Sequence, residues 1–103
     1  MGSGISKSPV EQIDEVVDKM FTTAIGFQNM DNKQRDEQFT ECANQMNAVK
    51  RRIKPDEQET RAAFRRLEKM YSLFQNDYYV INCTVNLPMR INHASYEKIL
   101  KIK

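Results

Sequence analysis

The sequence has few of the residues that build catalytic, metal or disulfide sites. It contains one histidine, two cysteines and no tryptophan among 103 residues. Cys42 and Cys83 are too few for a disulfide framework or a zinc site, so we expect both to be reduced and structural. His93 has no Cys, Asp or Ser at a spacing that suggests a catalytic dyad. We therefore expect a protein that is not an enzyme and that uses no cofactor or metal.

Long apolar runs are also missing. A membrane-spanning helix needs about 20 mainly apolar residues, and no stretch of this sequence approaches that length. A secretory signal would show a basic start followed by an apolar segment, which is absent as well. We therefore expect the protein to be cytoplasmic and to remain on the cytosolic side of any membrane that it meets.

Glycine and proline are scarce, with three of each, and this favours long helices over a turn-rich fold. The hydrophobic share of 40% and the charged share of 29% are typical of a folded, soluble chain. The length allows one domain at most. We divide the chain into a leader (1–7), a helical domain (8–77) and a C-terminal arm (78–103).

Three stretches repeat apolar residues at steps of three and four, as an amphipathic helix does. Ser8 and Asp31 each precede such a stretch with a capping-box partner three residues later. Asp14 is the one charge inside the apolar arc of the first stretch, and we expect the helix dipole to favour it. The sequence predicts a mostly α fold of two or three antiparallel helices, a hairpin or small coiled-coil-like bundle, with an extended or partly helical C-terminal arm. The expected helices cover residues 9–28, 32–53 and 56–77.

The apolar stripe of the second expected helix is narrow and is flanked by amide side chains. A stripe this thin resembles a coiled-coil seam more than the face of a globular core. We predict that it packs against the helix of a partner and that the protein forms a homo- or hetero-oligomer. The seam residues are Phe39, Cys42, Met46, Val49 and Ile53.

Residues 78–87 are aromatic and β-branched, which favours a β-strand. A strand would have no partner in an otherwise helical chain. The segment could instead extend the third helix by a turn, lie over the bundle as an arm, or pair through Tyr79–Leu87 with the sheet edge of another protein. From Ala94 onward the sequence predicts a short basic helix that is capped by Ser95.

The first seven residues, MGSGISK, are consistent with a signal for N-myristoylation. The signal requires Gly2 behind a removable Met1 and Ser or Thr at position six, which Ser6 supplies. Lys7 agrees with the same pattern. A vector remnant would explain the Met-Gly-Ser-Gly start but not Ser6 and Lys7, so we favour acylation of Gly2.

A myristoyl chain alone binds membranes weakly, so a second attachment signal is needed. Basic residues supply three candidates for it: a cluster at the end of the second expected helix, a stripe along the third that includes Arg66, and the tail Lys98, Lys101 and Lys103. Solvated helix surface is the simpler interpretation of each cluster taken alone. Nucleic-acid binding is disfavoured because the aromatic residues lie on the opposite, apolar faces. The candidate residues for contact with an anionic membrane or partner are Lys50, Arg51, Arg52, Lys54, Arg61, Arg65 and Lys69.

The sequence thus favours a small non-enzymatic adaptor or complex subunit, myristoylated at Gly2 and anchored to the cytosolic face of a membrane. It would bind partner proteins through its helix faces. The alternative is a soluble helical subunit of a multiprotein assembly without a lipid. A basic nucleic-acid-binding domain is the third interpretation.

Overall fold

The structure is a computed structural model that describes residues 7–54, 58–83 and 91–103. These residues form helices that pack against one another, and they contain no β-strand. The mostly α class expected from the sequence is confirmed. The elements in chain order are α1 (Pro9–Gly26), the 3-10 turn η1 (Phe27–Asn29), α2 (Asn32–Arg52), α3 (Arg61–Cys83) and α4 (His93–Leu100).

The first two helices begin at the expected caps. Ser8 Oγ accepts a hydrogen bond from the backbone N–H of Glu11 at 3.2 Å. Asp31 Oδ1 accepts from the N–H of Gln34 at 2.8 Å, and the Gln34 side chain accepts from the N–H of Asp31 at 3.2 Å. These bonds satisfy N–H groups that have no partner inside the helix, so they fix where α1 and α2 start.

The helix α3 starts later and ends later than expected. Residues 58–60 form a turn before it, and α3 runs to Cys83, six residues beyond the predicted end. Of the conformations left open for residues 78–83, the structure shows the extension of the third helix and not a strand. Tyr78 follows Phe74 by four residues and is buried with it in the core, so tertiary packing overrides the β propensity of this segment. Residues 84–87 lie outside the described residues.

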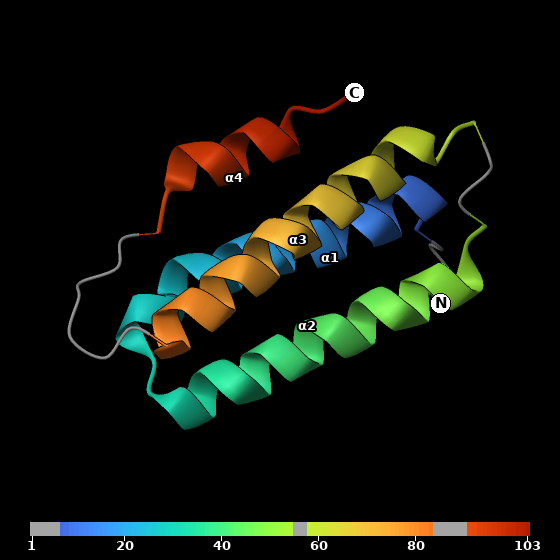
Figure 1. The fold of residues 1–103 in the computed structure, drawn as a ribbon. Coiled ribbons are helices and arrows are strands. Elements are labelled where there is room, and N and C mark those ends of the chain that lie inside the picture. Colours follow the sequence, from blue (N-terminus) through green and yellow to red (C-terminus); the bar gives the residue numbers. More distant parts are fainter. Residues whose placement is uncertain (1–6, 55–57, 84–90) are drawn as a thin grey trace.

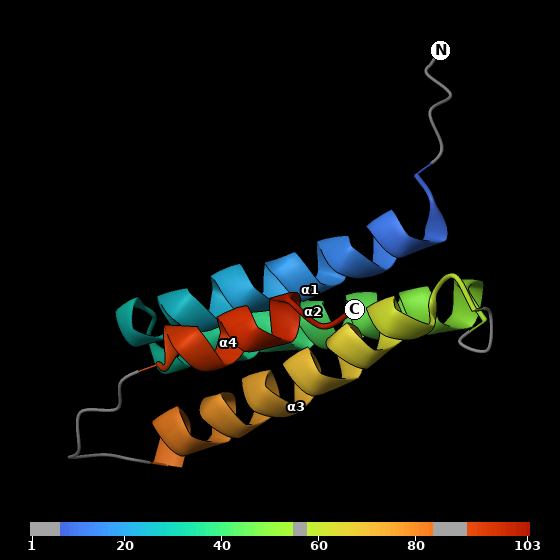
Figure 2. The ribbon, with the colours of Figure 1, turned by 90° about the horizontal axis from the view of Figure 1, so that it is seen from above.

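Figure 1 shows α1, α2 and α3 side by side, each running opposite to the one before it along the chain. The short helix α4 lies over α1 and α3, where Figure 2 places it between them. Its cap is Asn92 and not Ser95, because Asn92 Oδ1 accepts from the N–H of Ser95 at 3.3 Å. The core forms where these helices meet.

The narrow stripe of α2 packs inside the chain. Phe39 stacks on Tyr78 of α3 with ring centroids 4.2 Å apart, and Cys42 Sγ lies 3.7 Å from Thr23 Oγ1 of α1. The expected partner helix is therefore supplied by the chain's own α1 and α3. A thin stripe is sufficient because it fills the groove between two wider apolar faces. Phe39 is half-buried, and the buried members of the stripe are Cys42, Met46, Val49 and Ile53.

A buried polar pair attaches α4 to α3. The side chain of Tyr96 is fully buried, and its hydroxyl donates to Asp77 Oδ2 at 2.5 Å. The Tyr96 ring also contacts Phe21 of α1, with centroids 5.9 Å apart. Burial raises the pKa of the Tyr96 phenol far above its usual value, and the neighbouring Asp77 carboxylate raises it further. One side chain thus joins α4 to both helices beneath it.

Replacing Tyr96 with Phe keeps the ring but leaves the buried Asp77 carboxylate without this donor. We expect a loss of about 2 kcal/mol in the free energy of unfolding, since hydrogen bonds to charged groups contribute about that much. Urea denaturation followed by circular dichroism measures it. Tyr79→Phe is the matched control, because Tyr79 is 54% exposed; its change should stay within about 0.5 kcal/mol. Equal effects of the two variants would contradict the assigned role of Tyr96.

The raised pKa of Tyr96 also predicts a dependence of stability on alkaline pH. The unfolded chain loses the phenol proton near pH 10, whereas the folded chain retains it, so the folded state is penalised as the pH rises above that value. The stabilisation that comes from the protonated Tyr96 phenol is complete below about pH 10 and declines above it. Between about pH 10 and 12, Tyr96→Phe should lose stability less steeply than the wild type, by about 1.4 kcal/mol per pH unit. Identical slopes would contradict this.

Candidate functional site

The alternating helix directions bring basic segments that are distant in sequence to one end of the bundle, which we call the basic end. Figures 1 and 2 both show the start of α1, the end of α2 and the start of α3 at this end. Gln12 of α1 and Arg52 of α2 line the same shallow depression, so the first turns of α1 lie beside the last turn of α2. Residues 50–66 include seven basic and three acidic side chains.

The last turn of α2 supplies the first part of the basic end. Lys50, Arg51 and Arg52 are its final residues, and all three are exposed. Arg51 Nε donates to the backbone carbonyl of Asn47 at 3.4 Å. Cations are favoured here because the unpaired carbonyls of a helix C-terminus carry partial negative charge. Lys54, beyond the cap, is exposed as well.

The helix α3 supplies a stripe of three exposed cations. Arg61, Arg65 and Lys69 follow one another at four-residue steps and share one face of the helix. Arg61 and Arg65 lie in the first turns of α3 and therefore belong to the basic end. Lys69 lies about one turn farther along, at the edge of a groove between α3 and α4.

Arg66 does not join this surface, although it adjoins the stripe in sequence. Its guanidinium donates to both oxygens of Asp14, at 3.0 and 3.1 Å, and its Nη1 donates to the carbonyl of Ile102 at 2.5 Å. Only 14% of the Arg66 side chain is exposed. Arg66 thus ties α1, α3 and the C-terminal residues together. The sequence signal for this contact was Asp14, the single charge in the apolar arc of α1.

The leader joins α1 at the basic end. Lys7 forms an ion pair with Glu15, and its backbone carbonyl accepts a hydrogen bond from Gln12 Nε2 at 3.0 Å. These contacts fix residue 7 beside the first turns of α1. Gly2 and Ser6, the other residues of the acylation signal, lie outside the described residues. An acyl group on Gly2 would be joined by four intervening residues to a position beside the cations of α2.

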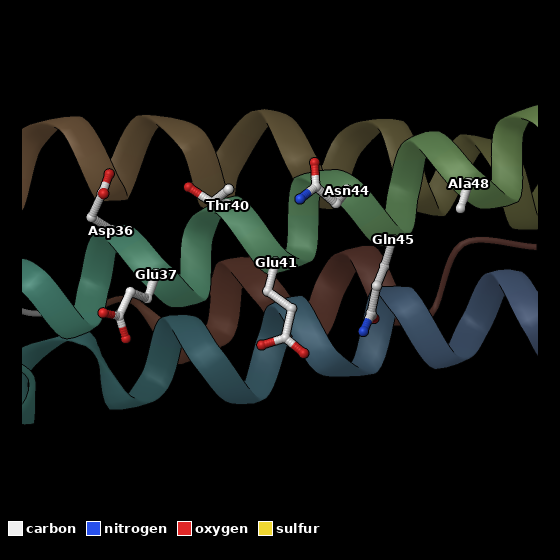
Figure 3. A pocket seen from close by; sticks show the side chains of 7 residues that line it. All are labelled: Asp36, Glu37, Thr40, Glu41, Asn44, Gln45 and Ala48. Atoms are coloured by element: carbon white, nitrogen blue, oxygen red, sulfur yellow. The ribbon is translucent and has the colours of Figure 1, made fainter.

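The first half of α2 has the opposite charge. A shallow depression on its outer face is lined by three carboxylates together with small and amide side chains, and Figure 3 shows these along the exposed side of the helix. The Glu41 carboxylate pairs with Lys19 of α1 at 2.6 Å. The helix thus passes from acidic to basic along its length. The lining residues are Asp36, Glu37, Thr40, Glu41, Asn44, Gln45 and Ala48.

The described residues, 7–54, 58–83 and 91–103, include no cluster of three or more His, Cys, Asp or Glu side chains that could bind a metal ion. Burial raises the pKa of the Cys42 thiol, so this cysteine is a poor nucleophile at neutral pH. His93 is exposed at the first position of α4. No helix in the described ranges has the length and apolar character needed to cross a membrane.

No protein-family model matches the chain, and no curated protein or solved structure matches it either.

The neighbours Arg65 and Arg66 allow a matched test of which cation is structural. Arg66→Met removes three hydrogen bonds and leaves Asp14 unpaired. We expect the free energy of unfolding to fall by about 1–2 kcal/mol, which is less than for a fully buried pair because Asp14 is partly exposed. Arg65→Met changes an exposed cation and should stay within about 0.5 kcal/mol. Chemical denaturation of both variants decides the matter, and a larger loss for Arg65→Met would reverse the assignment.

Proposed function

We propose that the protein is a small non-enzymatic adaptor or complex subunit that attaches to the cytosolic face of a membrane. Myristate on Gly2 is one part of the attachment, and the basic end is the other. The observation that carries the proposal is that Lys7, the last residue of the leader, lies at the same end of the bundle as the exposed cations of α2 and α3. The remaining helix surface is then available to partner proteins.

Neither part of the attachment is sufficient alone. A single myristoyl chain binds a bilayer with an association constant of about 10⁴ M⁻¹. Each Lys or Arg held near an anionic leaflet adds about 1 kcal/mol. Lys50, Arg51 and Arg52 are exposed in one helical turn, so together they would strengthen the attachment by about two orders of magnitude. Because they share an end with the leader, both signals can act on one surface.

The structure also limits where partners can bind. The stripe of α2 is filled by α1 and α3, so the adaptor role has to use outward faces of the bundle. Tyr79 and Val80, near the end of α3, are the large hydrophobic residues most exposed among the described part of the chain. The acidic outer face of α2 would be repelled by an anionic membrane, and it would therefore face the cytosol.

The acylation is tested by the intact mass of the protein expressed in a eukaryotic cell. We expect loss of Met1 and gain of a C14 acyl group, and we expect Gly2→Ala to abolish both the added mass and membrane recovery. The Gly2 variant should melt like the wild type, because the leader precedes the cap of α1. An unmodified Met1 would refute the lipid part and would favour the soluble helical subunit of a larger assembly.

The basic end is tested by co-sedimentation of acylated protein with vesicles that contain phosphatidylserine. Replacing Lys50, Arg51 and Arg52 together by Gln should weaken binding by about two orders of magnitude, at about 1 kcal/mol for each charge. High salt should have a similar effect on the wild type. Lys33→Gln is the control, since Lys33 is exposed in the first turn of α2, at the opposite end. Equal binding by the triple variant and the wild type would remove the basic end from the proposal.

A further inference from the structure

An open groove lies between α3 and α4, and none of the cations of the basic end lines it. One wall runs from Lys69 to Asn76 of α3, and the other runs from Ser95 of α4 to Ile102, two residues beyond the end of that helix. Each wall contributes four residues at successive steps of three, one and three, the spacing that keeps side chains on one helix face. The α3 wall is therefore about 10 Å long, seven steps of about 1.5 Å each.

The floor of the groove is apolar. Leu73 comes from α3, and Ile99 and Ile102 come from the C-terminal segment. All three are half-buried, and Leu73 and Ile99 pack against the core. A groove of two helical turns with branched aliphatic side chains matches the apolar stripe of a third helix, which places residues at i, i+3, i+4 and i+7. The groove is shallow and open, which suits a helix better than a small molecule that must be largely enclosed.

The charged residues that line the groove are both lysines. Lys69 and Lys98 are exposed, and neither forms an ion pair with a carboxylate among the described residues. The acidic neighbours Glu68 and Glu97 do not line the groove. A ligand that places carboxylates beside an apolar stripe would pair with these lysines, whereas a basic ligand would be repelled.

We propose that this groove binds an amphipathic helix of a partner protein whose apolar stripe is flanked by Asp or Glu. The apolar stripe would lie on Leu73, Ile99 and Ile102, and the flanking carboxylates would pair with Lys69 and Lys98. This inference deepens the partner-binding half of the proposed function but does not depend on the acyl chain, and the following test uses protein without myristate.

The probe is a fluorescein-labelled helical peptide of about two heptads, with Leu at the stripe positions and Glu beside them. A second peptide carries Lys in place of every Glu. We expect the acidic peptide alone to bind in fluorescence anisotropy, and to shift the amide resonances of Leu73 and Ile99 in ¹⁵N-labelled protein. The absence of binding by the acidic peptide, binding of both peptides alike, or resonance shifts confined to another surface would each overturn the proposal.

Charge reversal supplies the matched variants. The double variant Lys69→Glu with Lys98→Glu should weaken binding of the acidic peptide by about tenfold or more. It should also allow the basic peptide to bind. Lys33→Glu with Asn44→Glu and Asn47→Glu lowers the net charge by the same four units at exposed sites on α2, which does not line the groove, so this control should leave the binding of both peptides unchanged. If the control weakened binding of the acidic peptide as much as the groove variant does, the effect would be one of net charge and the assignment would be refuted.

Two further results would give the groove another occupant and overturn the proposal. The first is concentration-dependent self-association of the wild type that the groove double variant abolishes, since this would assign the groove to a second copy of the chain. The second is binding of unacylated protein to phosphatidylserine vesicles that depends on Lys69 and Lys98 and excludes the acidic peptide. Loss of acylation or of vesicle binding with the peptide result intact would refute the membrane proposal alone.

Discussion

The apolar faces of α1 and α3 pack against each other along much of their length, and the other helices are added to this pair. Ile13, Met20, Leu67, Met70 and Phe74 are fully buried, and the stacking of Phe27 on Phe74, with centroids 5.2 Å apart, closes the core at one end. Transfer of such side chains out of water is the main force available to a chain of this size. The thin stripe of α2 and the short α4 are stable because this surface already exists.

Polar contacts determine how the added parts sit on that surface. Tyr96 donates to Asp77 where α4 meets α3, and Arg66 joins Asp14 to the carbonyl of Ile102. Hydrophobic packing is non-directional, whereas each of these bonds requires a particular register between two elements. Since α4 has only eight residues, it is too short to be stable as an isolated helix. Its position, and with it the groove beside α3, therefore depends on a few side chains.

Local sequence signals predicted the local structure well. The caps at Ser8 and Asp31 and the periodic stripes located α1 and α2 because each signal acts within a few residues. The composition of residues 78–83 favoured a strand, but the segment also satisfies helical spacing against the core, and packing against distant residues decided for the helix. The basic residues were visible in the sequence, but their common end and the removal of Arg66 from the surface follow from long-range pairing. The groove between α3 and α4 joins residues nineteen or more positions apart, so no local pattern could reveal it.

The contact between Arg66 and Ile102 has a practical consequence for labelling. It holds Ile102, which lines the groove between α3 and α4, so a reporter protein fused after Lys103 would stand beside that groove. Such a fusion would crowd the groove proposed to bind a partner helix, and the affinity measured for the fusion would be lower than that of the untagged chain. A small dye on the exposed Cys83, at the far end of α3, leaves that groove clear. The buried Cys42 would remain unlabelled in the folded protein.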